Sequence, residues 1–215
     1  MDYREMKMEI QKTASQAFKE GLVAGTSGNV SMFDAENRVM GITPTNTAYQ
    51  TMKPEDVVLM KLDGTIVEGC LKPSSEWRLH AGIYEHLDEA RAVIHTHSPH
   101  ASSFAVNHET VPLVLVEMLP FLRGDIPLAE FGMPGTPEVG EKAVEAMTNP
   151  KRYACLLANH GVVAFGSSLA QAYIRAVYVE DAAKIYHMAR QVGEPEIINK
   201  DIERKLREKY NMLED

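Results

Sequence analysis

The chain has 215 residues, 45% of them apolar and 24% charged, which is enough for a single soluble domain over residues 1–215 with a sizeable core. The formal net charge of −8 argues against non-specific binding to nucleic acid or anionic membranes, so an anionic ligand would need local donors. Two separate cysteines, Cys70 and Cys155, and the lack of a leader-like or membrane-spanning apolar run indicate a cytoplasmic protein.

The first half of the chain alternates helical and extended patterns. Apolar residues at helical spacing predict a helix over residues 3–20, after which a glycine-rich turn at 25–31 enters a strand. The loop at 72–76 opens a helix that reaches about residue 87, with Ser74 or Ser75 as its cap. Short apolar runs bounded by turn residues predict the strands between them, at residues 39–43, 57–62 and 65–67.

The second half continues in the same way. A strand that carries His95 and His97 leads into a helix at 99–106, with Ser98 as its cap and Pro99 in its first position. Several strand pairs have connections too short for a parallel crossover, so we expect an α/β fold with a mixed or mostly antiparallel sheet covered by helices. The remaining predicted elements are strands at 111–116, 127–131, 154–158 and 162–165, and helices at 137–147 (capped by Thr136), 168–189 and 199–210.

Three histidines are candidate metal ligands. His95 and His97 are two apart on a strand, so their side chains point to the same face, and two neutral imidazoles side by side suit Zn²⁺, Co²⁺ or Mn²⁺. His160 follows an apolar strand and precedes Gly161, which allows a sharp turn and leaves room beside the ring. Three imidazoles leave an open coordination position, as in a catalytic metal site, whereas each histidine alone is equally compatible with a structural role.

Small polar loops are candidate anion sites. Gly25–Asn29, Thr45–Asn46 and the serines Ser74 and Ser75 offer backbone N–H groups and hydroxyls, the serines at the N-terminus of a predicted helix. Each loop alone also fits an ordinary turn or cap. Glu76 directly follows the serines, and it is either a first-turn carboxylate that interacts with the helix dipole or a general base beside a bound phosphate.

Five motifs follow one another in the chain, and together they resemble the class II aldolase/adducin superfamily, with fuculose-phosphate aldolases as the most similar members. The resemblance covers about residues 5–190. The motifs are Gly25-Thr-Ser-Gly-Asn-Val-Ser31, Ile42-Thr-Pro-Thr45, Lys72-Pro-Ser-Ser-Glu-Trp-Arg-Leu-His80, Val93-Ile-His-Thr-His-Ser-Pro-His100 and Asn159-His-Gly161.

The resemblance implies a three-layer α/β/α sandwich with a mostly antiparallel central sheet. It implies a homotetramer with active sites at subunit interfaces, and one divalent metal per chain, with Zn²⁺ favoured and Mn²⁺ or Co²⁺ as alternatives. The implied site residues are His95, His97 and His160 for the metal, Gly28, Asn29, Thr45, Ser74 and Ser75 for a phosphate, and Glu76 as acid/base and occasional fourth ligand.

The implied reaction is the reversible cleavage of a ketose 1-phosphate, of the fuculose 1-phosphate or 5-deoxyribulose 1-phosphate type, to dihydroxyacetone phosphate and a small aldehyde. Alternatives are a ribulose-5-phosphate 4-epimerase, a methylthioribulose-1-phosphate dehydratase and a non-enzymatic adducin-like scaffold. Epimerases of this kind usually carry aspartate where this chain has Glu76, and scaffold domains generally lack the metal histidines, so both observations favour the aldolase.

Two positions depart from the pattern of the fuculose-phosphate aldolases. Asn46 stands where those enzymes typically have glycine, which affects the second phosphate loop. The stretch Leu115–Met118 contains no tyrosine, although those enzymes have one about there that is thought to protonate the aldehyde oxygen. Glu117 is the candidate for part of that role, and a plain surface position is the alternative.

Overall fold

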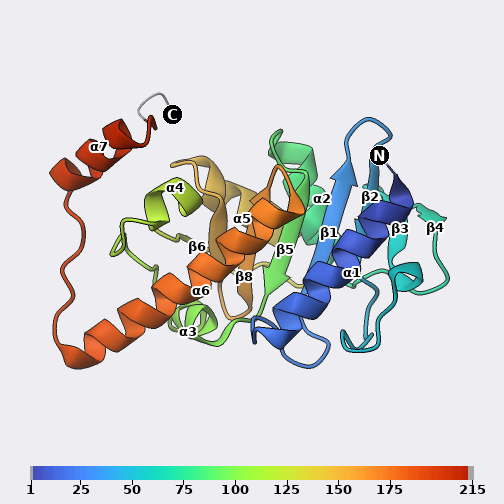
Figure 1. Cartoon of the computed structure of the whole chain (residues 1–215), viewed down its shortest axis with the longest axis horizontal. Coiled ribbons are helices and arrows are strands. Elements are labelled where there is room, and N and C mark those ends of the chain that lie inside the picture. Colours follow the sequence, from blue (N-terminus) through green and yellow to red (C-terminus); the bar gives the residue numbers. More distant parts are fainter. Residues whose placement is uncertain (1, 213–215) are drawn as a thin grey trace.

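An eight-stranded sheet forms the middle of the computed structural model, which describes residues 2–212 (Figure 1). The strand order is β4-β3-β2-β1-β5-β8-β7-β6, and neighbouring strands are antiparallel except for β6 and β7. The mostly antiparallel sheet is therefore confirmed. The strands are β1 (Asn29–Asp34), β2 (Val39–Ile42), β3 (Val58–Lys61), β4 (Ile66–Glu68), β5 (Ala92–Thr96), β6 (Leu128–Ala129), β7 (Ala154–Leu157) and β8 (Gly161–Gly166).

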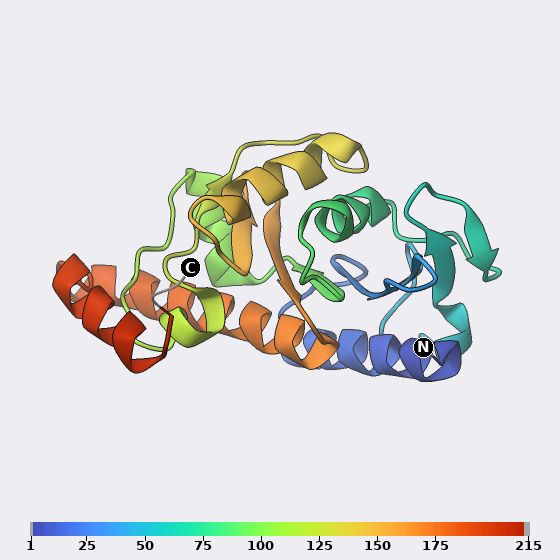
Figure 2. The same cartoon turned by 90° about the horizontal axis from the view of Figure 1, so that it is seen from above.

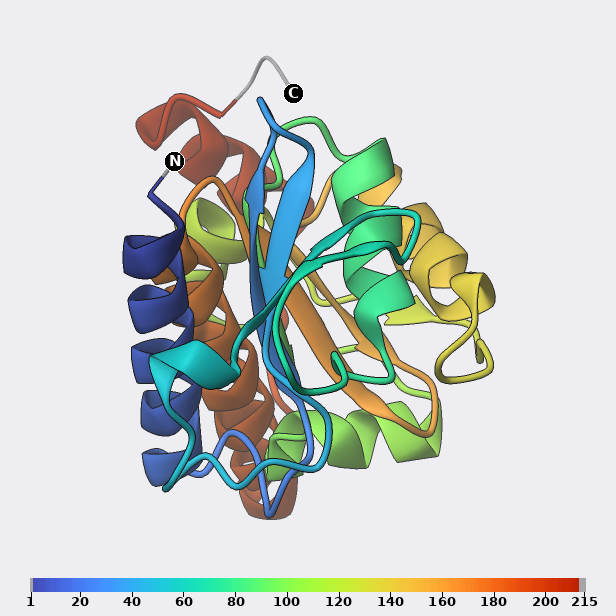
Figure 3. The same cartoon turned by 90° about the vertical axis from the view of Figure 1, so that its right-hand side faces the viewer.

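Helices cover both faces of the sheet, which confirms the three-layer α/β/α sandwich (Figures 2 and 3). Among the described residues, no helix is both long and apolar enough to cross a membrane. The helices are α1 (Tyr3–Lys19), α2 (Trp77–His86), α3 (Pro99–Asn107), α4 (Met118–Leu122), α5 (Pro137–Thr148), α6 (Leu169–Val192) and α7 (Lys200–Lys209), with a short 3₁₀ helix, η1 (Pro54–Asp56).

The helices reach the sheet through apolar stripes that the sequence already displays. In α1, Met6, Ile10 and Ala14 recur every four residues and are buried, so this helix lies along one face of the sheet together with α6. Helices α2 and α5 pack against each other on the opposite face (Figure 3). Their buried side chains form a second apolar core with that face of the sheet.

Strand β5 lies in the middle of the sheet and is buried on both sides. Ala92 and Ile94 belong to the core under α1 and α6, whereas Val93 belongs to the core under α2 and α5. A strand buried on both faces is apolar throughout, and β5 departs from this only at its end, where His95 is paired with Asn29 of β1 and Val163 of β8. This register brings a polar strand end into contact with the loops that precede β1 and β8.

The predicted strand at residues 111–116 is wrong. Val111 forms only an isolated bridge with Ile126, and Pro112 follows it, which has no N–H group for a ladder. The same apolar run instead ends in α4, a helix that the sequence analysis did not predict because Pro120 lies within it. Pro120 is tolerated there because it falls in the first turn, where backbone N–H groups have no partner in the helix.

Candidate metal centre

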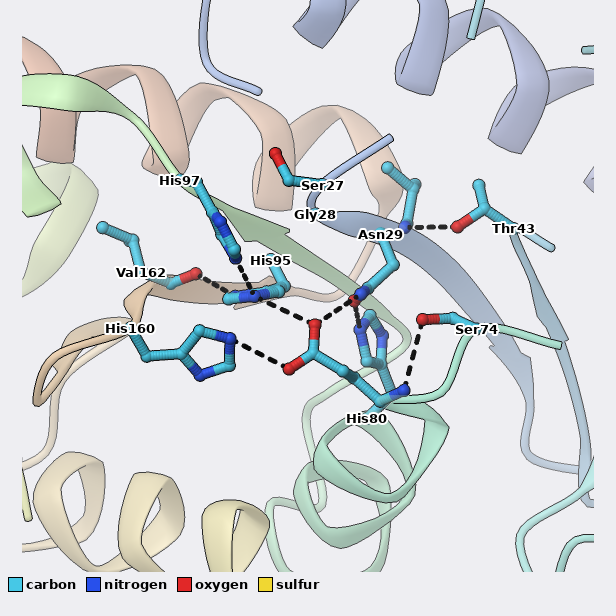
Figure 4. Close-up of polar contacts among 12 residues, drawn as sticks. Ser27, Gly28, Asn29, Thr43, Ser74, His80, His95, His97, His160 and Val162 are labelled. Atoms are coloured by element: carbon cyan, nitrogen blue, oxygen red, sulfur yellow. Dashed lines mark hydrogen bonds and ion pairs between the residues drawn. The ribbon is translucent and has the colours of Figure 1, made fainter. Parts of the chain in front are cut away.

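The three candidate histidines meet at the end of the two central strands. His95 is in β5, His97 directly follows β5, and His160 is in the tight turn between β7 and β8. Their ring centroids are 4.7 Å apart for His95 and His160, 4.8 Å for His95 and His97, and 5.2 Å for His97 and His160. Strand alternation places the first two on one side, and pairing of β5 with β8 brings in the third (Figure 4).

Gly161 makes this approach sterically feasible. A Cβ atom at this position would lie 2.4 Å from the Thr96 carbonyl oxygen and 3.0 Å from Cδ2 of His97. The sharp turn itself, which the sequence analysis attributed to Gly161, is formed by Asn159, whose φ is 54°. Gly161 therefore provides the room for the rings, and Asn159 provides the left-handed backbone conformation.

The hydrogen bonds of His95 define which ring nitrogen faces the centre. Nδ1 lies 2.8 Å from the carbonyl oxygen of Val162, and because a carbonyl only accepts, Nδ1 carries the proton. Nε2 is therefore the nitrogen that faces the centre, 2.9 Å from Nε2 of His97. A histidine held in this way by a backbone carbonyl is the usual arrangement for a metal ligand.

Glu76 completes the cluster from the start of α2. Its Oε1 lies 3.0 Å from Nε2 of His160, and its Oε2 lies 3.2 Å from Nε2 of His95. One potential ligand atom from each of Glu76, His95, His97 and His160 lies within 4.8 Å of all the others. Apart from its close contact with His160, Oε1 of Glu76 is buried without a hydrogen-bond partner, and so is Nδ1 of His160. Three imidazoles with one carboxylate form a donor set that suits Zn²⁺. The residues therefore fit a divalent metal.

The protonation states also fit a cation site. Burial by itself would raise the pKa of Glu76, but the neighbouring His95 and His160 outweigh it and lower that pKa overall. Burial, and then the charges that His95 and His160 can carry, lower the pKa of His97 to about 4. At neutral pH, Glu76 is thus ionised and His97 is neutral.

The glycine loop before β1 closes against the histidine strand. Gly28 has a φ of 72°, and a Cβ atom there would lie 2.7 Å from the carbonyl oxygen of His95. The hydroxyl of Tyr49 donates to the Gly28 carbonyl over 2.6 Å and keeps the loop in place. Asn29 points inward, and its Nδ2 donates to Oε2 of Glu76 over 3.0 Å (Figure 4). Gly28 and Asn29, predicted as phosphate residues, therefore lie beside the histidines.

The other two predicted phosphate loops are joined to each other. Ser74 N donates to the Thr43 carbonyl over 3.0 Å, and Thr45 N donates to the Lys72 carbonyl over 3.0 Å. The hydroxyl of Ser74 is buried and accepts from the backbone N–H of Glu76 over 3.3 Å, whereas Ser75 is exposed and Thr45 is half-buried. The structure thus joins Ser74 to the backbone of Glu76, whereas Ser75 and Thr45 are more exposed to solvent.

The expectation that Ser74 or Ser75 caps helix α2 is wrong. Glu76 occupies the N-cap position, and its side chain makes no capping hydrogen bond. The physical reason is that the carboxylate turns away from the helix toward His95 and His160. The residue that would ordinarily satisfy the first N–H groups of this helix is instead part of the ligand cluster.

The sequence analysis missed the residues behind the carboxylate. His80 was not among the candidate site residues, but it is fully buried, with Nε2 hydrogen-bonded to Oδ1 of Asn29 and Nδ1 2.6 Å from Oγ of Ser31. Glu76, His80 and Tyr84 are four residues apart, so they share one face of α2. Polar residues repeated every four positions on the inner face of an amphipathic helix were the signal that could have found them.

The fold and this cluster define an α/β/α protein with a candidate metal centre at the strand ends. Residues 8–187 match the class II aldolase and adducin N-terminal domain, and the chain belongs to this family.

Three similar proteins illustrate the relationship. The 5-deoxy-D-ribulose 1-phosphate aldolase of Bacillus thuringiensis serovar kurstaki is 35% identical over 94% of this chain and 93% of its own length. The L-ribulose-5-phosphate 4-epimerase UlaF of Salmonella paratyphi C is 32% identical over 86% of this chain and 88% of its own length. A solved structure of an L-fuculose 1-phosphate aldolase superimposes with a TM-score of 0.90 at 35% identity and covers 96% of both chains.

Proposed function

We propose that this protein is a divalent metal-dependent aldolase of the cytoplasm that cleaves a ketose 1-phosphate to dihydroxyacetone phosphate and a small aldehyde. The observation that carries the proposal is a buried residue, Glu76, whose carboxylate lies among three imidazoles and accepts a hydrogen bond from Asn29, while its backbone N–H donates to Ser74. Membership of the class II aldolase family and the activity named for the Bacillus thuringiensis relative support the same reaction.

One divalent ion per chain would be held by His95, His97 and His160, with Glu76 beside it. Nitrogen donors with an open position favour Zn²⁺, and Mn²⁺ or Co²⁺ are the alternatives. When bound, the ion supplies Lewis-acid polarisation of the ketose carbonyl. The Val162 carbonyl keeps Nε2 of His95 directed at the centre, so the site is oriented by the backbone of β8.

The substrate phosphate would be bound by N–H groups and hydroxyls of the loops around Gly28, Thr45, Ser74 and Ser75. One hydrogen of Asn29 Nδ2 is used by Glu76, and the other remains for the phosphate. Such neutral donors suit a chain with a net charge of −8, because they attract an anion without a general positive field.

Glu76 would accept the carbon-bound proton of dihydroxyacetone phosphate in the condensation direction and return it to the same carbon during cleavage. The lowered pKa keeps the carboxylate ready to accept this proton at neutral pH. The Asn29 amide and the Ser74 hydroxyl hold the residue from its side chain and its backbone, respectively. A carboxylate positioned in this way contributes about 10²- to 10⁴-fold to a proton transfer.

A homotetramer with active sites at its subunit interfaces completes the proposal. The loop after β6 carries Phe131 and Met133, which are 49% and 54% exposed. The same loop lies against the loop at residues 72–76, because a Cβ atom at Gly135 would lie 3.3 Å from the Ser75 carbonyl oxygen. It is also held to helix α2, where Arg78 Nη1 donates to the Gly135 carbonyl over 3.1 Å. Exposed apolar side chains beside the site are where a second copy of the chain would dock.

A cleavage assay tests the proposed reaction. Purified protein loaded with Zn²⁺ would be incubated with fuculose 1-phosphate, 5-deoxyribulose 1-phosphate and methylthioribulose 1-phosphate, with coupled detection of dihydroxyacetone phosphate. We expect release from at least one ketose, loss of that activity on chelation and recovery on addition of metal. No dihydroxyacetone phosphate from any of the three would contradict the proposal.

An epimerase is the second candidate, because the Salmonella relative named as an epimerase is 32% identical to this chain. Glu76 argues against it, since epimerases of this type usually carry aspartate there. The same protein would be given ribulose 5-phosphate and its product identified. Epimerisation of that sugar without any release of dihydroxyacetone phosphate would replace the aldolase proposal, and dehydration of methylthioribulose 1-phosphate would indicate the dehydratase.

A further inference from the structure

A line of four buried side chains runs away from Glu76 into the interior. Asn29 lies next to the carboxylate, His80 lies behind Asn29, and Ser31 lies behind His80, with its Oγ 2.6 Å from Nδ1 of His80 (Figure 4 shows the first part). The hydroxyl of Tyr84 ends the line, 2.6 Å from the same Ser31 oxygen. The residues are at most 6% exposed, so solvent does not replace any of these hydrogen bonds.

Each hydrogen bond in this line has a defined direction. Because a carboxylate only accepts, Asn29 donates Nδ2–H to Glu76 and leaves Oδ1 to accept from Nε2–H of His80. Burial lowers the pKa of His80 to about 3, so the ring is neutral and its Nδ1 accepts the proton of Ser31. Ser31 in turn accepts from the phenol of Tyr84, whose own pKa is raised by burial.

The two secondary elements that carry the line have matching repeats. Asn29 and Ser31 are two apart in β1 and therefore face the same side of the strand. Glu76, His80 and Tyr84 are four apart and share the face of α2 that packs on this strand. The helix thus supplies the carboxylate, the imidazole and the phenol, and the strand supplies the groups that link them.

We propose that His80, fixed by Ser31 and Tyr84, is a positioning residue that sets the amide orientation of Asn29 and through it the direction of the Glu76 carboxylate. The inference rests on the proposed role of Glu76 as acid/base. None of the three residues is placed against the substrate, so they act through Asn29 and are not catalytic residues.

Removal of the Ser31 hydroxyl is expected to change the orientation of the Asn29 amide through His80. Without this hydroxyl, Nδ1 of His80 loses the donor that keeps this nitrogen unprotonated, so the ring can move its proton from Nε2 to Nδ1. Nε2 would then face Oδ1 of Asn29 as a second acceptor, and the amide would flip to recover a hydrogen bond. Oδ1 would next face Oε2 of Glu76, and two acceptors at that distance repel each other.

The test compares Ser31→Ala with Ser102→Ala. The Ser102 hydroxyl is also buried, but it lies in α3 and has no hydrogen-bond partner, so the control removes the same atom outside the line. Tyr84→Phe is a second variant that keeps the ring and removes only the terminal hydroxyl.

Three quantities are measured: the ¹⁵N spectrum of His80 in metal-free protein, kcat and KM for ketose cleavage, and the Kd for Zn²⁺ from chelator competition. The His80 signal is assigned by its absence in His80→Gln.

In the wild type and in Ser102→Ala, His80 should be the Nε2–H tautomer. In Ser31→Ala this signature should be lost, kcat should fall about 10- to 100-fold with KM within about twofold, and Kd for Zn²⁺ should rise, in line with the effect of residues that support a metal site. Tyr84→Phe should show the same changes at smaller size. An unchanged His80 tautomer in Ser31→Ala would overturn the proposal, and so would a kcat and a Zn²⁺ Kd that both stay within about twofold of the control.

A wild-type protein that cleaved no ketose 1-phosphate would refute the proposed function and would leave this inference testable. The tautomer and the Zn²⁺ Kd need no substrate, and together they would then decide whether the line orients Glu76. A changed tautomer with weaker Zn²⁺ binding would support it, and the absence of either change would overturn it.

Discussion

The pKa values of Glu76 and His97 are both lowered in the site, which leaves Glu76 charged and His97 neutral at neutral pH. Burial would keep a lone carboxyl protonated, but the imidazoles beside Glu76 favour its ionised form and lower its pKa. Burial and the neighbouring imidazoles both disfavour a charged His97, whose pKa falls to about 4. The result at neutral pH is a carboxylate among imidazoles, at least one of them neutral, which is the form of these side chains that binds a divalent cation.

The first prediction concerns the metal. His97→Ala should lose bound Zn²⁺ on dialysis and lose cleavage activity, because two imidazoles and a carboxylate hold the ion less well than three imidazoles with that carboxylate. Metal content by mass spectrometry and the activity assay measure both effects. His86→Ala, an exposed histidine of α2, is the control and should keep its metal. One equivalent of metal retained in His97→Ala would rule out this ligand set.

The second prediction concerns acid stability of the metal-free protein. The folded-state pKa of His80 is about 3, below its ordinary 6.5, so the unfolded state binds this proton first as the pH falls. Stability should therefore drop between pH 6.5 and 3, by up to about 1.4 kcal/mol per pH unit from this residue. Denaturant unfolding of the wild type and His80→Gln at several pH values measures the difference in slope. If the free energy of unfolding changed with pH in the same way in both proteins, the prediction for His80 would be wrong.

At the scale of elements, local patterns predicted most of the fold. Apolar residues at helical spacing predict the helix α1, and a short continuous apolar run predicts the buried strand β5. The error at residues 111–116 shows the limit, since a short apolar run with Pro112 fits a strand or a buried irregular segment equally well. Local pattern also fails to say which face of α2 packs on β1, and that packing is what makes His80 part of the site.

The candidate site was predictable to the same extent. Strand alternation predicted that His95 and His97 lie side by side, and the glycine after His160 predicted the space beside it. The proximity of His160 to that pair depends on the pairing of β5 with β8, which no local pattern specifies, so it was expected only from the metal chemistry of three imidazoles and from the family resemblance. The contact of Asn29 with Glu76 likewise depends on long-range register.

The third prediction tests the approach of β8 to the histidines. Gly161→Ala should lower the free energy of unfolding by about 1–3 kcal/mol and reduce metal binding, because the new methyl group would overlap the Thr96 carbonyl oxygen and touch His97. Denaturant unfolding and metal analysis provide the two measurements. Gly193→Ala is a matched control, since a Cβ atom there meets nothing within 4 Å. Equal stability and metal content in the two variants would contradict the close packing at Gly161.

At the scale of the whole molecule, a loop with exposed apolar side chains lies against the loop that precedes Glu76. Phe131 and Met133 are exposed there, next to the loop that carries Ser75. The net charge of −8 opposes association of copies in general, so a specific apolar contact is needed to bring them together. In the proposed tetramer, such a contact would couple assembly to the environment of the candidate site.

The fourth prediction follows from that coupling. The wild type should sediment as a tetramer, and Phe131→Glu should shift it toward smaller species and reduce activity, because a buried charge at an interface is unfavourable. Val192→Glu is the control, since Val192 is 91% exposed at the end of α6, far along the chain from this loop. A wild-type monomer with full activity at the sedimentation concentration would contradict the assembly.

Solvent deuterium exchange into dihydroxyacetone phosphate is the most direct test of the central claim, that Glu76 moves a carbon-bound proton beside a metal held by three histidines. The metal-loaded wild type should exchange, and the metal-free protein should not. Glu76→Gln should keep its metal and still bind dihydroxyacetone phosphate, yet lose exchange by about 10²-fold or more. Glu117→Gln should spare it, because Glu117 is exposed at the start of α4 and any role there lies on the aldehyde side. Exchange by Glu76→Gln at the wild-type rate would contradict the account.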